Sequence, residues 1–121
     1  MSNIKKILSN ILNPWPPIIR SVQRDSLTYL EDTALNDLFE LVTRIEENGR
    51  DGMIIETGCA LGGSAIVMAH AKSKQRPLYV YDVFEIIPPP TNKDDTDVHE
   101  RYRIIKDGQA QGIGGKKYYG Y

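Results

Sequence analysis

Apolar residues recur at two different spacings along the chain, and these spacings predict its helices and strands. Between residues 33 and 49 they return every three or four positions, which is the period of an amphipathic helix: Ala34, Leu35, Leu38, Leu41, Val42 and Ile45. Asp32 or Thr33 is expected to cap the start of this helix, and Asn48 with Gly49 to end it.

A strand–helix–strand order follows this helix. Residues 52–56 form a short run that is apolar on both faces, as a strand buried in a parallel sheet requires, and residues 77–83 form a second such strand. Between them, residues 64–74 have helical spacing. This order is a βαβ unit, which belongs to the α/β class. We therefore expect a Rossmann-like parallel sheet with flanking helices, incomplete because the sequence shows only two convincing strands.

The remaining segments set the division of the chain. Residues 1–26 are interpreted as an N-terminal helix followed by a linker in which prolines exclude helix: Pro14, Pro16 and Pro17. Residues 27–121 are interpreted as a partial domain. Within it, Asp97 begins a capping-box pattern that predicts one more helix, ended by Gly108.

Composition limits the kinds of molecule and environment that we expect for this protein. The chain has 121 residues, enough for one small domain, and its 15 basic and 16 acidic residues leave no electrostatic footprint for nucleic acid. No stretch approaches the roughly 20 apolar residues that cross a membrane. Cys59 is the single cysteine, so no disulfide can form within the chain. We expect a cytoplasmic protein whose Cys59 is a packing residue.

The glycine-rich turn after the first strand, residues 54–64 (IIETGCALGGS), is the main candidate for chemistry. A turn between a parallel strand and a helix lies at the sheet edge where α/β folds bind ligands, and the helix start favours an anion. The lysine of a nucleotide-binding P-loop is absent. Ala60 stands where a dinucleotide fingerprint needs glycine, although Asp82 would suit a ribose, so a nicotinamide-binding oxidoreductase stays an alternative.

An adenosyl ligand without a pyrophosphate meets the pattern better. In this interpretation Gly58, Gly62 and Gly63 cradle a carboxylate at the helix start, Glu56 accepts hydrogen bonds from an ammonium, and Asp82 binds the ribose. A turn in which the glycines serve packing alone and Ser64 caps the helix remains open beside it.

The segments IIETGCALGGSA and LYVYDVFEIIPPP together resemble a class I S-adenosylmethionine-dependent methyltransferase, and more narrowly the N-terminal half of the macrocin O-methyltransferase (TylF-like) family. The family's E-T-G-x-x-x-G-G-S turn corresponds to residues 56–64, and its D-x-F-x-x-x-P-P segment to residues 82–89. The resemblance covers residues 27–121. It implies cofactor-binding roles for Glu56, Thr57, Gly58, Gly62, Gly63, Ser64 and Asp82.

The resemblance also implies a function: S-adenosylmethionine-dependent O-methylation of a sugar or natural-product hydroxyl. Leu61 departs from the arginine expected in many relatives, and family members are expected to continue for about another hundred residues. That half would carry the Mg²⁺ ligands and most of the acceptor pocket, so a truncated fragment is expected. A non-catalytic remnant, or a half-domain that needs a partner chain, stays the alternative, and a homo-oligomer stays open.

Other polar residues are given no chemical role. The acidic cluster of Asp94, Asp95 and Asp97 is interpreted as a solvated loop rather than a metal site. Residues 86–97, between the second strand and the last helix, are a candidate lid. No catalytic base and no metal ligand are named.

Overall fold

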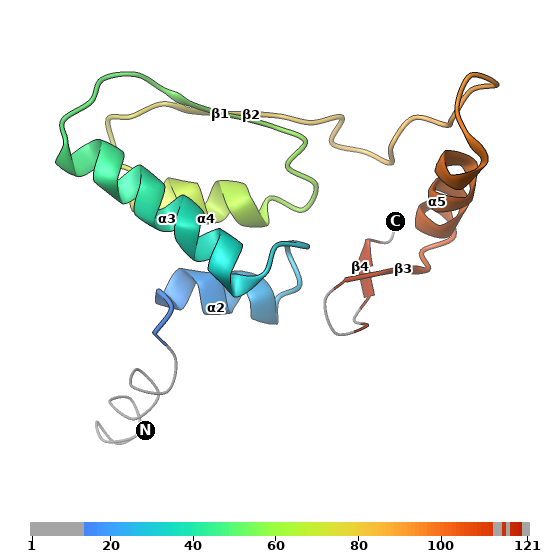
Figure 1. Cartoon of the computed structure of the whole chain (residues 1–121), viewed down its shortest axis with the longest axis horizontal. Coiled ribbons are helices and arrows are strands. Elements are labelled where there is room, and N and C mark those ends of the chain that lie inside the picture. Colours follow the sequence, from blue (N-terminus) through green and yellow to red (C-terminus); the bar gives the residue numbers. More distant parts are fainter. Residues whose placement is uncertain (1–13, 113–114, 116, 120–121) are drawn as a thin grey trace, which may run out of the picture.

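The computed structural model describes residues 14–112, 115 and 117–119. The N-terminal helix expected ahead of the prolines lies outside this part. The described elements are, in chain order, α2 (Pro17–Arg24), α3 (Asp32–Glu47), β1 (Ile54–Thr57), α4 (Gly63–Ala71), β2 (Leu78–Tyr81), α5 (Thr96–Lys106), β3 (Ala110–Gln111) and β4 (Lys117–Tyr119). Figure 1 shows α3 and α4 along one face of the β1–β2 pair, with α5, β3 and β4 grouped at the other end of the molecule.

The predicted strand–helix–strand unit is confirmed. β1 and β2 pair in parallel, from Ile54 opposite Leu78 to Thr57 opposite Tyr81, and α4 connects them. Within the described residues this sheet has two strands. The α/β class is therefore established, while the larger Rossmann-like sheet stays a prediction.

Helix α3 is stabilised because part of its apolar stripe packs into the core of the protein. Leu35 and Val42 lie on the same helical face, two turns apart, and are buried, whereas Leu41 of the same stripe is exposed. Gly49 ends the helix with a φ of 60°, as predicted, because glycine adopts this left-handed conformation without a steric penalty. The predicted cap was wrong: the residue before the helix is Glu31, one position ahead of Asp32.

Helix α2 corrects the expectation of a linker. Pro17 is the first residue of this helix, a position at which the missing backbone N–H has no helical partner to lose. Ile19 and Val22 are buried against Leu35 of α3 and Val67 of α4. Burial of each such side chain contributes about 1.5–3 kcal/mol, so α2 is part of the core. Whether residue 26 divides two structural units stays a prediction.

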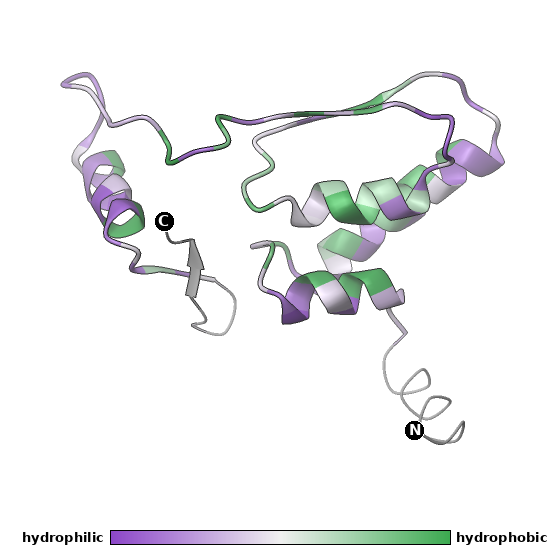
Figure 2. Ribbon diagram, turned by 180° about the vertical axis from the view of Figure 1, so that it is seen from behind, coloured by the Kyte–Doolittle hydropathy of each residue, from purple (hydrophilic) through white to green (hydrophobic). Residues whose placement is uncertain are grey.

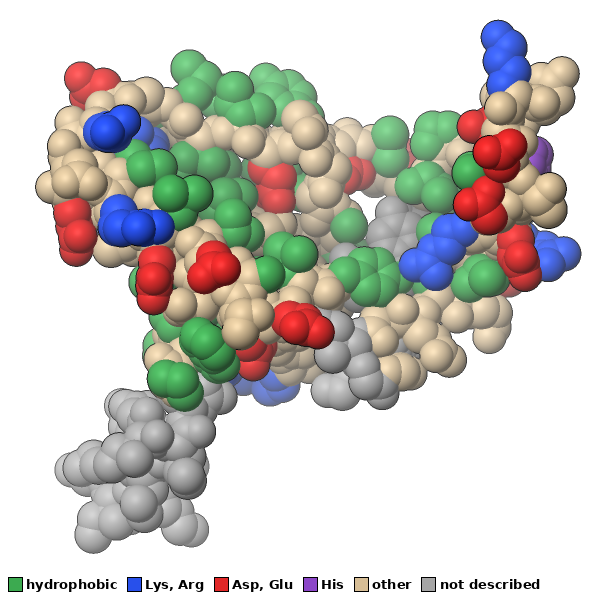
Figure 3. Space-filling view, in the orientation of Figure 1, with side chains coloured by type: hydrophobic (Ala, Val, Ile, Leu, Met, Phe, Trp, Pro, Cys, Tyr) green, Lys and Arg blue, Asp and Glu red, His purple; other side chains and the backbone are tan. Residues whose placement is uncertain are grey.

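The far face of the β1–β2 pair is open within the described residues. Ile55 and Tyr81 are each 58% exposed and Tyr79 is 47% exposed, and Figure 3 shows hydrophobic side chains gathered over these strands. Figure 2 shows that hydrophobic and more hydrophilic residues both occur along these strands. The sequence pattern predicts that both strands are covered on both faces. Only the face toward α3 and α4 is covered by the described chain.

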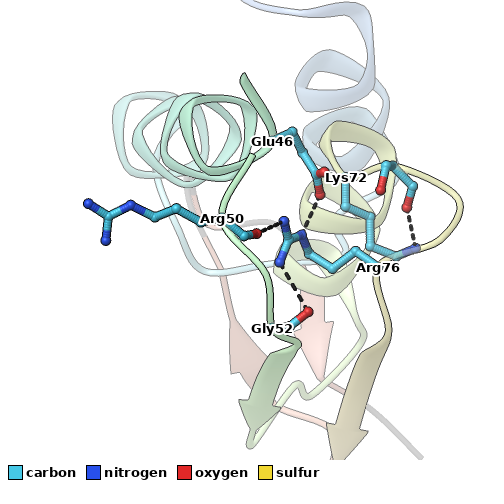
Figure 4. Close-up of polar contacts among 6 residues, drawn as sticks. Glu46, Arg50, Gly52, Lys72 and Arg76 are labelled. Atoms are coloured by element: carbon cyan, nitrogen blue, oxygen red, sulfur yellow. Dashed lines mark hydrogen bonds and ion pairs between the residues drawn. The ribbon is translucent and has the colours of Figure 1, made fainter. Parts of the chain in front are cut away.

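Arg76 fastens the other end of the sheet, where the chain enters β1 and β2. Its guanidinium forms an ion pair with Glu46 at the end of α3 and donates hydrogen bonds to the backbone carbonyls of Arg50 and Gly52 (Figure 4). The Arg76 side chain is 9% exposed. Because three segments converge on one buried guanidinium, the turn between α3 and β1 is held to the segment before β2.

The region after β2 forms a second small cluster. Ile105 of α5 and Ala110 of β3 are buried, and Ile86, Ile87 and Ile104 pack against them. β3 pairs with β4 in antiparallel fashion, a pairing that the sequence pattern did not predict. The residue before α5 is Asp95 and not Asp97, and its side chain makes no capping hydrogen bond, so the predicted capping box was wrong.

Candidate functional site

The glycine turn joins the carboxyl end of β1 to α4. Gly58 and Gly62 have φ values of 80° and 83°, which favour glycine, and a Cβ built on either would meet nothing within 4 Å. Ala60 between them is also left-handed, with a φ of 48°. The turn is therefore strained at one alanine and open at two glycines, and the open space lies where a ligand of an α/β sheet would approach.

Gly63 has a different reason to be glycine. A Cβ there would lie 2.5 Å from the carbonyl oxygen of Leu27 and 2.6 Å from Cβ of Thr28. The N–H of Gly63 also donates to that carbonyl at 3.0 Å. The packing alternative therefore accounts for Gly63, since the absent side chain lets the start of α4 touch the segment before α3.

Asp82 ties the ends of the two strands together. Its Oδ2 accepts a hydrogen bond from the N–H of Ala60 at 3.0 Å, and its Oδ1 accepts one from the N–H of Phe84 at 3.1 Å. The backbone N–H groups of Phe84 and then Ala60 lower the pKa of Asp82 below its usual value. Asp82 is therefore an anion at neutral pH, and its oxygens retain lone pairs that can accept bonds from hydroxyl groups.

Glu56, at the end of β1, is held from one side only. Its Oε1 accepts a hydrogen bond from the hydroxyl of Ser64 on α4. Its Oε2 is buried and has no hydrogen-bond partner in the described structure. A buried carboxylate oxygen costs free energy unless a donor reaches it, so Glu56 is suited to receive a cationic or N–H group of a ligand. Ser64 thus orients Glu56, whereas Thr57 is exposed in the strand.

A cavity of about 610 Å³ lies beside these strand ends. One wall comes from the glycine turn and the end of β2, and the other from the loop before α5 and from α5 itself; its lining residues are Tyr29, Gly58, Ala60, Tyr81, Asp82, Val83, Ile87, Pro88, Arg101 and Ile105. Of the predicted site residues, the cavity brings together Gly58 and Asp82. The other predicted site residues are not among those that line it: Glu56, Thr57, Gly62, Gly63 and Ser64.

Tyr29 and Arg101 of this cavity were missed by the sequence analysis. The two residues are 72 positions apart, and their side chains meet, with Nη2 of Arg101 3.2 Å from the hydroxyl of Tyr29. The spacing of residues along the sequence cannot predict a contact between two residues so far apart. The one available signal was that Arg101 falls on the predicted helix after the candidate lid, whose residues Ile87 and Pro88 do line the cavity.

Cys59 sits in the turn without the properties of a nucleophile. Burial, and then the negative charges of Asp82 and Glu56, raise the pKa of its thiol. A thiol with a raised pKa carries little thiolate at neutral pH, and the thiolate is the reactive form. The interpretation of Cys59 as a packing residue agrees with this environment.

The acidic loop before α5 is organised by its own hydrogen bonds. Asp94 accepts bonds from the N–H and the hydroxyl of Thr91, and these contacts lower the pKa of Asp94. Among the described residues, no group of three or more His, Cys, Asp or Glu side chains is placed to hold a metal ion.

Within the described residues, no helix has the length and apolar character needed to cross a membrane.

Comparisons with known proteins assign the chain to a family. Searches of curated proteins and of solved structures found no match. The family model described as macrocin O-methyltransferase (TylF) matches residues 20–109, a span that begins within α2 and includes the glycine turn, Asp82 and α5. The chain therefore belongs to the macrocin O-methyltransferase (TylF) family.

Proposed function

We propose that the chain binds S-adenosylmethionine in the cavity at the carboxyl ends of β1 and β2, as the donor-binding part of an O-methyltransferase. The observation that supports this most is the pairing, on one cavity wall, of an open glycine turn at Gly58 with the anionic Asp82. A nucleoside with an amino-acid tail needs both features. The family supports O-methyl transfer as the reaction.

Three groups would hold the cofactor. Asp82 would accept hydrogen bonds from the ribose hydroxyls, because it stays ionised and ends the second strand. The free Oε2 of Glu56 would receive the ammonium of the methionine end, directly or through a water molecule. Gly58 would allow the ligand close to the backbone, since a side chain there would occupy the open space.

The bound cofactor supplies an electrophilic methyl group on its sulfonium. The protein's contribution is to position the donor and exclude water, which is the larger part of catalysis in a displacement of this kind. The apolar residues Val83, Ile87 and Ile105 line the cavity and would limit water around the donor. We assign no general base among these residues.

Substrate and partners follow from the family as proposals. The acceptor would be a hydroxyl of a sugar or another natural product, reaching the cavity beside the loop that precedes α5. A second copy or a complementing chain is a candidate to cover the open face that carries Ile55, Tyr79 and Tyr81. A cytoplasmic location fits the single cysteine, because no disulfide can form within the chain.

Calorimetric titration with S-adenosylhomocysteine tests the proposal. We expect micromolar binding to the chain, and a loss of at least tenfold in Asp82→Ala, because the ribose contacts are hydrogen bonds to a charged acceptor. Asp37→Ala is the matched control, since Asp37 is an exposed acid on α3. Absence of heat from a sample whose circular dichroism shows a folded protein would reject the cofactor assignment.

A further inference from the structure

Arg101 on α5 is the basic side chain that lines the cavity. Its Nη2 donates a hydrogen bond to the hydroxyl of Tyr29 at 3.2 Å, and its guanidinium lies over the Tyr29 ring at 6.0 Å from the centroid. No ion pair joins Arg101 to an acid within the described part of the chain. The cavity therefore has an anion, Asp82, on one wall and, on the other, a cation that pairs with none of the described acids.

The contact with Tyr29 determines where that cation lies. Tyr29 belongs to a segment fixed at the start of α4, because the carbonyl of Leu27 accepts the N–H of Gly63 at 3.0 Å. Thr28 is buried, and its hydroxyl accepts the N–H of Leu30 at 3.0 Å. The Arg101 guanidinium is thus held beside the segment that packs on the beginning of α4.

The glycines predicted to cradle a carboxylate are already engaged. The N–H of Gly58 donates to the carbonyl of Tyr81 at 2.8 Å, that of Gly62 to the carbonyl of Cys59 at 2.8 Å, and that of Gly63 to Leu27. These three N–H groups are therefore not available to bind an anionic group of a ligand. A guanidinium offers five N–H groups in a planar fork that matches the two oxygens of a carboxylate.

We propose that Arg101 binds the carboxylate of the cofactor's amino-acid end, with Tyr29 as the side chain that positions its guanidinium. This inference rests on the proposed function, because it assumes that the cofactor occupies the cavity. Two parts of the chain would then bind opposite ends of the ligand. Asp82, which follows β2, would bind the ribose, and Arg101 of α5 would bind the amino-acid end.

A pair of ligands that differ in the carboxylate separates this role from general packing. S-Adenosylhomocysteine carries the amino-acid end, whereas 5′-methylthioadenosine has the same adenosine and thioether without it. In Arg101→Gln we expect S-adenosylhomocysteine to bind about tenfold to 100-fold more weakly, because a charge-assisted pair is lost. The affinity for 5′-methylthioadenosine should stay within about twofold of the original protein.

Two further variants complete the test. Arg101→Lys keeps the charge without the fork and should recover part of the lost affinity for S-adenosylhomocysteine. Arg103→Gln is the matched control, because Arg103 is exposed on the same helix and does not line the cavity, and both affinities should be unchanged. Equal losses for both ligands in Arg101→Gln, or no loss for either, would overturn the assignment of Arg101 alone. If the original protein binds neither ligand, the proposed function is rejected with it.

Discussion

Replacement of Gly63 by alanine tests whether this glycine is required by packing. The added Cβ would lie 2.5 Å from the oxygen of Leu27, 2.6 Å from Cβ of Thr28 and 2.9 Å from Cγ1 of Val22. Two of these atoms belong to the backbone or to the base of a buried side chain, so they cannot move aside freely. The start of α4 must shift away from the segment before α3.

The expected cost combines three effects. Overpacking of a well-filled site costs about 1–3 kcal/mol. The hydrogen bond from Gly63 to Leu27 lies in the same contact, and its weakening adds about 1 kcal/mol. The change from glycine to alanine returns about 0.5–1 kcal/mol through the entropy of the unfolded chain. We expect a net loss of about 1–3 kcal/mol, which lowers the melting temperature by roughly 4–15 °C in a domain of this size.

Thermal unfolding followed by circular dichroism measures this loss. Gly62→Ala is the matched control at the neighbouring position, since a Cβ there meets nothing and the cost is limited to a positive φ, about 1 kcal/mol. Gly63→Ala should be the more destabilised of the two. A melting temperature within about 2 °C of the original protein would refute the packing argument.

Three other outcomes follow from the structure. Arg76→Gln should lower the melting temperature by roughly 5–10 °C through the loss of charge-assisted bonds, while the exposed Lys74→Gln leaves it unchanged. Because the folded pKa of Asp82 is lowered, its stabilising effect is complete above the usual aspartate pKa and is lost as the pH falls toward the folded value. Urea unfolding should therefore show a steeper acid loss in the original protein than in Asp82→Asn, and parallel curves would contradict this. Iodoacetamide should alkylate Cys59 more slowly at pH 7 than a free cysteine, and an equal rate would contradict its raised pKa.

The parts of the fold that could be predicted from the sequence are those fixed by local pattern. Three features of this kind depend on neighbouring residues alone, and the structure has all of them: the helical stripe of α3, the left-handed residue Gly49 at its end and the glycine turn before α4. Helix α2 could not be predicted in this way, because three closely spaced prolines indicate a linker. Pro17 nevertheless occupies the first helical position, where proline is tolerated.

In the candidate site, too, some residues could be predicted from local sequence pattern and others could not. Gly58 and Asp82 could be predicted because each directly follows a strand, and parallel strands bring their carboxyl ends together. Arg101 and Tyr29 could not, because their contact depends on how the cluster around α5 sits beside the glycine turn. The role of Gly63 also required coordinates, since a packing glycine and a ligand-binding glycine look alike in a sequence.

The cavity at the carboxyl ends of β1 and β2 is the proposed binding site of the cofactor. Amide chemical shifts of the ¹⁵N-labelled chain, recorded during titration with S-adenosylhomocysteine, test it most directly. We predict saturable shifts at Gly58, Ala60 and Val83, which line the cavity. The hollow at the opposite end of the sheet, beside Met53 and Arg76, should stay unshifted. Shifts confined to that hollow, or no saturable shifts in a folded sample, would contradict the account.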